Sequence, residues 1–136
     1  MNGRGFLDTN ILVYAYDRSD PGKQQRAQEL LASSIREESG ALSTQVLGEF
    51  FVVATRRIPA PLSVAEASEI LDAVSVLPVE EIDLPLVRKA LETVRAHAVS
   101  YWDALILAAA ERAGCTTLFT EDLDAGHHDQ IGRAHV

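Results

Sequence analysis

The chain has 136 residues, of which 47% are hydrophobic and 24% are charged, and its formal net charge is −8. This length can bury the core of one domain, and the composition is that of a soluble globular protein. The acidic excess argues against nucleic-acid binding by general electrostatic attraction, but it leaves open a nuclease whose acids hold cations. A single cysteine, Cys115, rules out an internal disulfide and fits a reducing compartment.

The N-terminal segment has no signal-peptide pattern, because Asp8 and Asn10 interrupt its apolar stretch. No run of the sequence approaches the ~20 apolar residues of a membrane helix. We therefore expect a cytoplasmic protein that has no membrane partner.

Short apolar runs alternate with longer helical patterns along the chain. In chain order, the sequence predicts a strand at 5–7, helices at 9–16 and 22–39, a strand at 41–43, helices at 44–57 and 63–74, a strand within 76–82, helices at 83–98 and 100–114, and a strand at 117–119 and its neighbours. Ser63 and Glu66 have capping-box spacing, and Gly114 closes the last helix. The alternation favours one α/β domain over 1–136, with a parallel sheet covered by helices on both faces.

Four acidic residues lie either after the strands of this predicted sheet or on the helices beside them, near the edge where ligand sites lie. Asp8 follows the first strand, Glu49 lies in the helix after the second, Asp103 begins the last helix, and Asp122 follows the last strand. Each aspartate also has a structural interpretation. Asp8 can cap the next helix, Asp103 stands three residues after Ser100 as in a capping box, and Asp122 lies in a turn-like stretch.

Two of these acids are predicted to face inward. Glu49 belongs to a helix that is apolar nearly all round, so we expect that helix to be buried on more than one side. The helical period places Asp103 on one stripe with Ile106 and Ala110. A buried carboxylate is costly unless it is paired or binds a metal, and converging carboxylates need cations to stay ionised. Oxygen ligands of this kind suit Mg²⁺ or Mn²⁺.

The segments FLDTNILVYA, LGEF and SYWDALILAAAERAGCTTLFTEDL resemble those of the PIN-domain ribonucleases and, among them, the VapC-like toxins of type II toxin–antitoxin pairs. The resemblance covers nearly the whole chain. It implies a PIN-like three-layer α/β/α sandwich with a short, mainly parallel central sheet. It also implies an endoribonuclease that depends on Mg²⁺ or Mn²⁺, cleaves single-stranded RNA, forms a homodimer and is held inactive by a cognate antitoxin.

The resemblance also assigns roles to residues. The family's acidic quartet falls on Asp8, Glu49, Asp103 and Asp122. Asp8, Asp103 and Asp122 would hold the metal ion. Glu49 would bind a second ion or position the attacking water.

The family's small polar helpers fall on Asn10 and Thr120, and with a looser match on Thr9 and Ser100. Asn10 would orient Asp8 or a ligand water through a hydrogen bond. Thr120 would hydrogen-bond a ligand or a phosphate oxygen.

The tail at 125–136 departs from the family pattern, because it is polar where family members close with an apolar strand. We interpret His127 and His128 as exposed residues and not as metal ligands. Arg56 and Arg57 are the one adjacent arginine pair in the interior of the chain, and we interpret Arg88, Lys89 and Arg95 as solvated surface. An acidic protein that contacts few phosphates is consistent with a structured RNA target such as tRNA.

The sequence bears differently on three other classes of protein. A catalytically inactive PIN-like module that binds RNA or a protein stays open. A receiver domain would need an acidic neighbour of Asp8 and a lysine after a late strand, and a dinucleotide-binding domain would need G-x-G-x-x-G after the first strand; the sequence has neither. Apolar residues in the segments 22–39 and 46–54 favour a homodimer and a groove for an antitoxin helix.

Overall fold

A central sheet organises the structure, a computed structural model that describes residues 3–120 and 128–130. Its five strands have the order β3-β2-β1-β4-β5. The first four are parallel to one another and β5 is antiparallel to β4. The strands are β1 (Arg4–Leu7), β2 (Gly40–Ser43), β3 (Val79–Glu80), β4 (Cys115–Phe119) and β5 (His128–Gln130).

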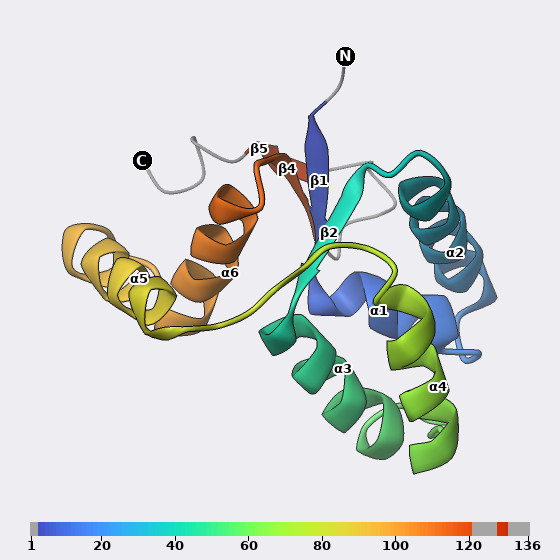
Figure 1. The fold of residues 1–136 in the computed structure, drawn as a ribbon. Helices are drawn as coiled ribbons and strands as arrows, with labels where there is room; N and C mark the ends of the chain where they lie inside the picture. The colour runs from blue at the N-terminus through green and yellow to red at the C-terminus, as the bar shows by residue number, and fades with distance from the viewer. Residues whose placement is uncertain (1–2, 121–127, 131–136) are drawn as a thin grey trace.

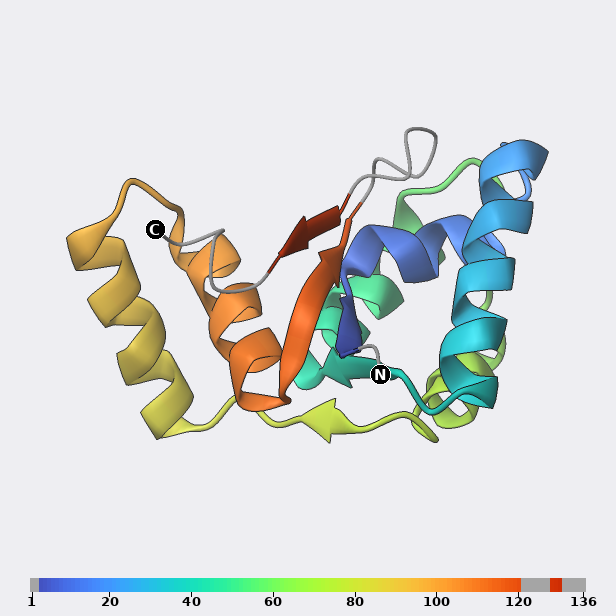
Figure 2. The same ribbon diagram turned by 90° about the horizontal axis from the view of Figure 1, so that it is seen from above.

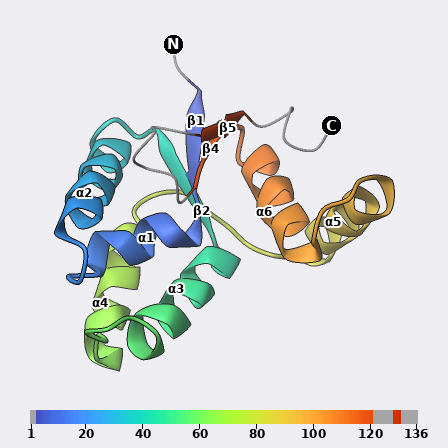
Figure 3. The same cartoon turned by 180° about the vertical axis from the view of Figure 1, so that it is seen from behind.

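Six helices in the described residues cover the two faces of this sheet: α1 (Thr9–Tyr16), α2 (Pro21–Arg36), α3 (Thr44–Arg56), α4 (Val64–Val74), α5 (Leu84–Ala96) and α6 (Tyr101–Arg112). Figures 1 and 2 show α1 to α4 on one side of the sheet and α5 with α6 on the other. The view from behind shows the same division (Figure 3). The predicted three-layer α/β/α sandwich with a mainly parallel sheet is therefore confirmed.

The helix ends follow the local signals of the sequence. The Ser63 hydroxyl accepts a hydrogen bond from the Glu66 backbone at 3.0 Å, and the Glu66 carboxylate accepts one from the Ser63 backbone at 2.8 Å. This is the predicted capping box. Gly114 has a φ of 78°, which a residue without a Cβ adopts readily, and α6 ends two residues before it.

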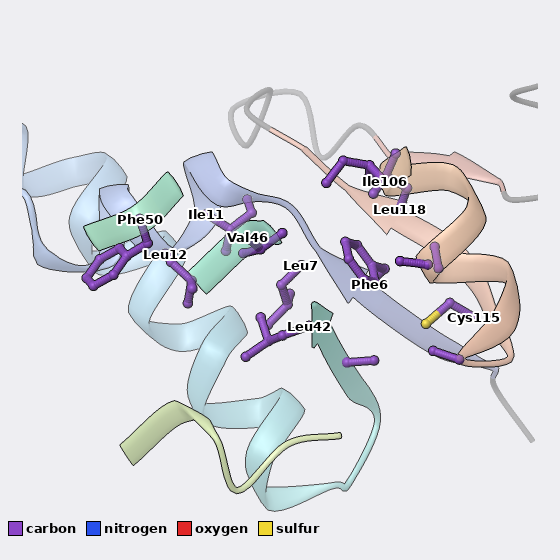
Figure 4. Close-up of a cluster of buried hydrophobic side chains, with 14 of the residues drawn as sticks. Phe6, Leu7, Ile11, Leu12, Leu42, Val46, Phe50, Ile106, Cys115 and Leu118 are labelled. Carbon is purple, nitrogen blue, oxygen red and sulfur yellow. The ribbon is translucent and has the colours of Figure 1, made fainter. Parts of the chain in front are cut away.

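The core lies on both faces of β1. Successive side chains of a strand point to opposite faces, so Phe6 and Leu7 enter different layers. In Figure 4 Phe6 lies toward Cys115 and α6, and Leu7 lies toward Leu42 and Val46. Phe6, Leu7, Leu42 and Val46 are fully buried. Because β1 is buried on both faces, the position of its end is fixed, and so is the position of Asp8, the residue that follows it.

Gly5 allows β1 and β4 to pair closely. A Cβ at this position would collide with the ring of Phe119 on the neighbouring strand. The Phe119 carbonyl accepts a hydrogen bond from the Asp8 backbone at 3.0 Å, just beyond the paired residues. The first predicted acid is thus tied through its backbone to the end of β4.

Two strands differ from the sequence-based expectation. The strand predicted within 76–82 has only the two residues Val79 and Glu80, which follow Pro78. The second difference is β5, which contributes three residues from the polar tail. Antiparallel pairing uses backbone groups, so a strand at the edge of a sheet does not require apolar side chains. None of the helices in the described ranges is long and apolar enough to cross a membrane.

Candidate functional site

An open pocket of about 700 Å³ lies at the carboxyl edge of the sheet. Figure 1 shows the backbone there, where β1 leads into α1 and β2 leads into α3. Three segments form its wall: the start of α1, the length of α3, and the first turn of α6. The lining residues are Asp8, Thr9, Asn10, Thr44, Gln45, Gly48, Glu49, Val52, Val53, Arg57, Trp102 and Asp103. Three acids of the predicted quartet and the predicted helper Asn10 therefore share one pocket.

Asp8 is the residue that joins β1 to α1. It occupies the N-cap position, and its Oδ1 accepts a hydrogen bond from the Thr9 backbone at 2.7 Å. The capping interpretation is therefore correct as a description of its position. The carboxylate also lines the pocket, so the two interpretations of Asp8 are compatible.

Glu49 is held by side chains from two helices. Its Oε1 accepts a hydrogen bond from the Thr9 hydroxyl at 2.7 Å, and its Oε2 accepts one from Gln45 Nε2 at 3.4 Å. Thr9 is 8% exposed, so this hydroxyl lies at the floor of the pocket. Because the Thr9 backbone also binds Asp8, one residue connects two of the acids.

The expectation that α3 would be buried on more than one side is wrong. Its buried residues are Val46, Phe50 and Ala54, which follow one helical face, and Val52 is 42% exposed. Glu49 is half-buried beside that face. The other side of α3 faces the pocket. The apolar residues of this helix therefore form part of the pocket wall as well as part of the core.

Asp103 is also placed differently from the expectation. It is exposed and does not point into the core with Ile106 and Ala110, which are both buried. Its backbone donates to the Ser100 hydroxyl at 3.0 Å, which is one half of a capping box. At the third position of α6 its charge lies near the positive end of the helix dipole, and this position favours a carboxylate.

Of the remaining predicted site residues, the structure describes Thr120, which follows β4 and does not line the pocket. Asp122 lies outside the described residues, as does His127. Within residues 3–120, no group of three His, Cys, Asp or Glu side chains is close enough to hold a metal ion. The acidic side chains on the pocket wall nevertheless offer oxygen atoms as metal ligands, and oxygen ligands fit Mg²⁺ or Mn²⁺.

Sequence reasoning missed two residues of the pocket. Gln45 lies one turn before Glu49, and its Nε2 donates to Glu49 and, at 3.4 Å, to the Trp102 carbonyl. Gln45 thereby connects α3 to α6, and its own Oε1 is buried without a hydrogen-bond partner among the described residues. Trp102 precedes Asp103 and is 60% exposed. A large aromatic residue next to a predicted ligand was the available signal.

Comparison with known proteins identifies the family and the fold. The sequence pattern of the PIN domain matches residues 5–131, so the chain belongs to the PIN domain family. The predicted resemblance is therefore confirmed. No curated protein matches the sequence.

Two solved structures share the fold. The toxin VapC20 of Mycobacterium tuberculosis, described as cleaving the Sarcin-Ricin loop, is 23% identical over 93% of this chain and 98% of its own, with a TM-score of 0.68. FitAB, solved bound to a DNA fragment, is 17% identical over 88% of this chain and 86% of the matched chain, with a TM-score of 0.63.

Proposed function

We propose that this chain is a single-domain endoribonuclease that depends on Mg²⁺ or Mn²⁺ and acts as the toxin of a toxin–antitoxin pair. The carrying observation is the convergence of Asp8, Glu49 and Asp103 on one open pocket in a PIN-family chain. These acids come from three separate segments, and helix capping does not require them to share a pocket. The likeness to VapC20 supports the toxin part of the proposal.

The metal site in this proposal consists of Asp8 and Asp103, completed by Asp122 from outside the described residues. These ligands fit such an ion because the acids, and the amide of Asn10 that lines the same pocket, all offer oxygen atoms. A bound divalent ion would lower the pKa of a coordinated water and offset charge on the scissile phosphate.

Glu49 is the proposed acceptor of the proton from the attacking water. Thr9 and Gln45 donate to its two oxygens, and this fixes the plane of the carboxylate before substrate arrives. Asn10 would orient Asp8 or a water molecule, and Thr120 would hydrogen-bond a phosphate oxygen. Preorganised groups of this kind lower the barrier because they need not reorient during the reaction.

The proposal also covers the partners of the chain and its location in the cell. Exposed apolar side chains on α2 and α3, Ile35 at 36% and Val52 at 42%, support a homodimer and a surface for an antitoxin. The substrate would be a structured RNA such as tRNA, because a chain of net charge −8 gains little from general phosphate attraction. The single cysteine supports a cytoplasmic location.

Cleavage of total cellular RNA with Mg²⁺, with Mn²⁺ and with EDTA tests the proposal. We expect metal-dependent cleavage by the wild type and at least a hundredfold loss in Asp8→Asn and Asp103→Asn. Asp72→Asn, an exposed aspartate of α4 outside the pocket, is the matched control and should keep full activity. RNA binding without cleavage in any metal would instead support the inactive PIN-like module.

A further inference from the structure

One large aromatic side chain is exposed at the edge of the proposed active site. Trp102 is the only tryptophan of the chain, and 60% of it is exposed. It lines the same pocket as Asp103, its neighbour in α6, and Asp8. Leaving an indole in water forgoes a large hydrophobic gain, so this exposure calls for a partner surface.

The structure holds this residue in place while leaving it open. Gln45 Nε2, from α3, donates to the Trp102 carbonyl at 3.4 Å. The Tyr101 ring lies edge-on to the indole, with centroids 5.0 Å apart and an interplanar angle of 69°. An aromatic ring that is already oriented loses little conformational freedom when it binds a flat ligand.

The pocket divides into a polar part and an apolar part. Asp8, Glu49 and Asp103 mark the polar part, where the proposed function places the scissile phosphate. Trp102 and Val52, which are 60% and 42% exposed, supply apolar surface on the same wall. A nucleotide has the same division, with a charged phosphate and a flat base.

Charge explains why a base contact is needed. The chain has a net charge of −8, and Arg57 is the only cationic side chain on the described wall of the pocket. Phosphate contacts therefore supply little affinity. Stacking of an unpaired base on an aromatic ring is insensitive to protein charge and is a common way to bind single-stranded RNA.

We infer that Trp102 is a stacking platform for an unpaired base beside the scissile phosphate, and that Arg57 contacts a flanking phosphate. This inference rests on the proposed function. The family resemblance already implies single-stranded RNA, and the inference adds the residue that would hold an unpaired base at the cleavage position. A base in a duplex is stacked on its neighbours and cannot offer a face to the indole.

Because Trp102 is the only tryptophan, its fluorescence tests the inference without any cleavage. The probes, in Ca²⁺ in place of Mg²⁺ or Mn²⁺, are a ten-nucleotide single-stranded RNA of mixed sequence, the same strand annealed to its complement, and an abasic ribose-phosphate chain of equal length. We expect saturable quenching with the single strand and at least tenfold weaker binding of the other two. Equal quenching by all three probes would overturn the base contact.

Kinetics of the metal-loaded protein supply the second measurement. Trp102→Ala should raise KM about tenfold, equivalent to about 1.4 kcal/mol, with kcat changed less than threefold. Trp102→Phe should recover most of the loss, because it keeps a stacking face. Leu84→Ala, which removes a 59% exposed side chain of α5 outside the pocket, is the control and should match the wild type.

The outcomes separate this inference from the proposed function. Normal cleavage by Trp102→Ala with unaltered KM would overturn the inference and leave the nuclease standing. Saturable quenching without cleavage in any metal would overturn the nuclease and support the platform. A change in Trp102 emission with protein concentration, but not with RNA, would make this surface an interface between copies of the chain and overturn the inference.

Discussion

Thr9 is the residue that couples the acids of the pocket. Its backbone binds Asp8 at 2.7 Å and its hydroxyl binds Glu49 at 2.7 Å, although these two acids are 41 positions apart in the chain. The residue is nearly buried, so water cannot readily replace its hydroxyl. Thr9 acts on the proposed reaction through Glu49 and is a positioning residue.

Replacing this hydroxyl by a methyl group should loosen Glu49. A hydrogen bond to a charged group contributes about 1.5–3 kcal/mol, so we expect Thr9→Val to lower kcat by at least tenfold with KM little changed. Thr9→Ser should restore most of the rate. Thr93→Val, which removes a hydroxyl bound to a backbone carbonyl of α5 at 3.3 Å, is the matched control. A Thr9→Val enzyme with normal kcat would show that Glu49 needs no such support.

The thiol of Cys115 should be inert in the folded protein. Burial raises the pKa of Cys115 to about 11, from an ordinary value of 9.0. At pH 8 roughly one molecule in a thousand would carry the reactive thiolate. We expect an aromatic disulfide reagent to label the native chain very slowly and to label one thiol per chain at once after unfolding. Rapid labelling of native protein would show that β4 opens readily.

The sequence predicts which acids meet but not how each is exposed. Asp8, Glu49 and Asp103 follow from one rule, the meeting of parallel strand ends. The helical period placed Asp103 on one stripe with Ile106 and Ala110, but the buried residues of α6 begin only at Ala104, so Asp103 is exposed. Gln45 and Trp102 were missed because their roles depend on contact between α3 and α6.

At the scale of elements, one arginine fastens α6 to the segment that leads into α5. Arg112 Nε binds Glu80 at 2.8 Å, and its Nη1 binds Asp83 at 2.9 Å. Its Nη2 also donates to the Glu81 carbonyl. These contacts lie at the opposite end of α6 from Asp103. They hold a segment whose own strand, β3, has only two residues.

The stabilisation from this contact should depend on pH. The hydrogen bond from Arg112, followed by one from the Leu86 backbone, lowers the pKa of Asp83 below its ordinary value of 3.8. A lowered folded pKa stabilises the protein above the unfolded pKa, and the effect is lost as the pH falls through the folded value. We expect Arg112→Met to lower the melting temperature at pH 7, with a gap to wild type that narrows toward pH 3.

Arg36→Met is the control for that measurement. Arg36 contacts Glu37 at 3.5 Å, and both side chains are more than 60% exposed. A pair of this kind contributes little. Equal melting temperatures for wild type and Arg112→Met at pH 7 would mean that the three contacts of Arg112 are as weak as the exposed pair.

Element boundaries were predicted where capping signals are local and missed where pairing is tertiary. The helix predicted at 9–16 is observed with those bounds, and Ser63 caps α4 as expected. The expected strand within 76–82 is shorter, and the segment 128–130 pairs with β4 although it is polar. Strand pairing uses the backbone of a neighbour that is distant in sequence, so side-chain patterns indicate it less well than they indicate helices.

At the scale of the whole molecule, the fold brings acidic side chains together. The chain has a net charge of −8, so it has few cationic groups with which to neutralise them. Three carboxylates share one pocket with a single arginine on its described wall. The core on both faces of β1 holds this arrangement in place, since Phe6 and Leu7 are fully buried. Ionised carboxylates that share a pocket repel one another, and a bound cation would relieve that repulsion.

Metal should consequently stabilise the folded protein, and acid should oppose it. Mn²⁺ at a hundred times its dissociation constant should add about 2.7 kcal/mol to the free energy of unfolding. Protonation competes with the ion for the carboxylates, so the gain should shrink at mildly acidic pH and return with excess Mn²⁺. Melting curves with and without Mn²⁺ at pH 7 and at pH 5 measure both effects.

Two variants locate that stabilisation. Asp8→Asn and Asp103→Asn keep the shape of the side chain and remove its charge, so Mn²⁺ should raise their melting temperatures far less than that of wild type. Without metal, the lost charge relieves repulsion in the pocket but also removes a favourable interaction between the carboxylate and the N-terminus of its helix, so these variants should melt close to wild type. Asp72→Asn, at an exposed position of α4, should respond to Mn²⁺ as wild type does. If Mn²⁺ stabilises all four proteins equally, the ion binds elsewhere and the carboxylate pocket is not its site.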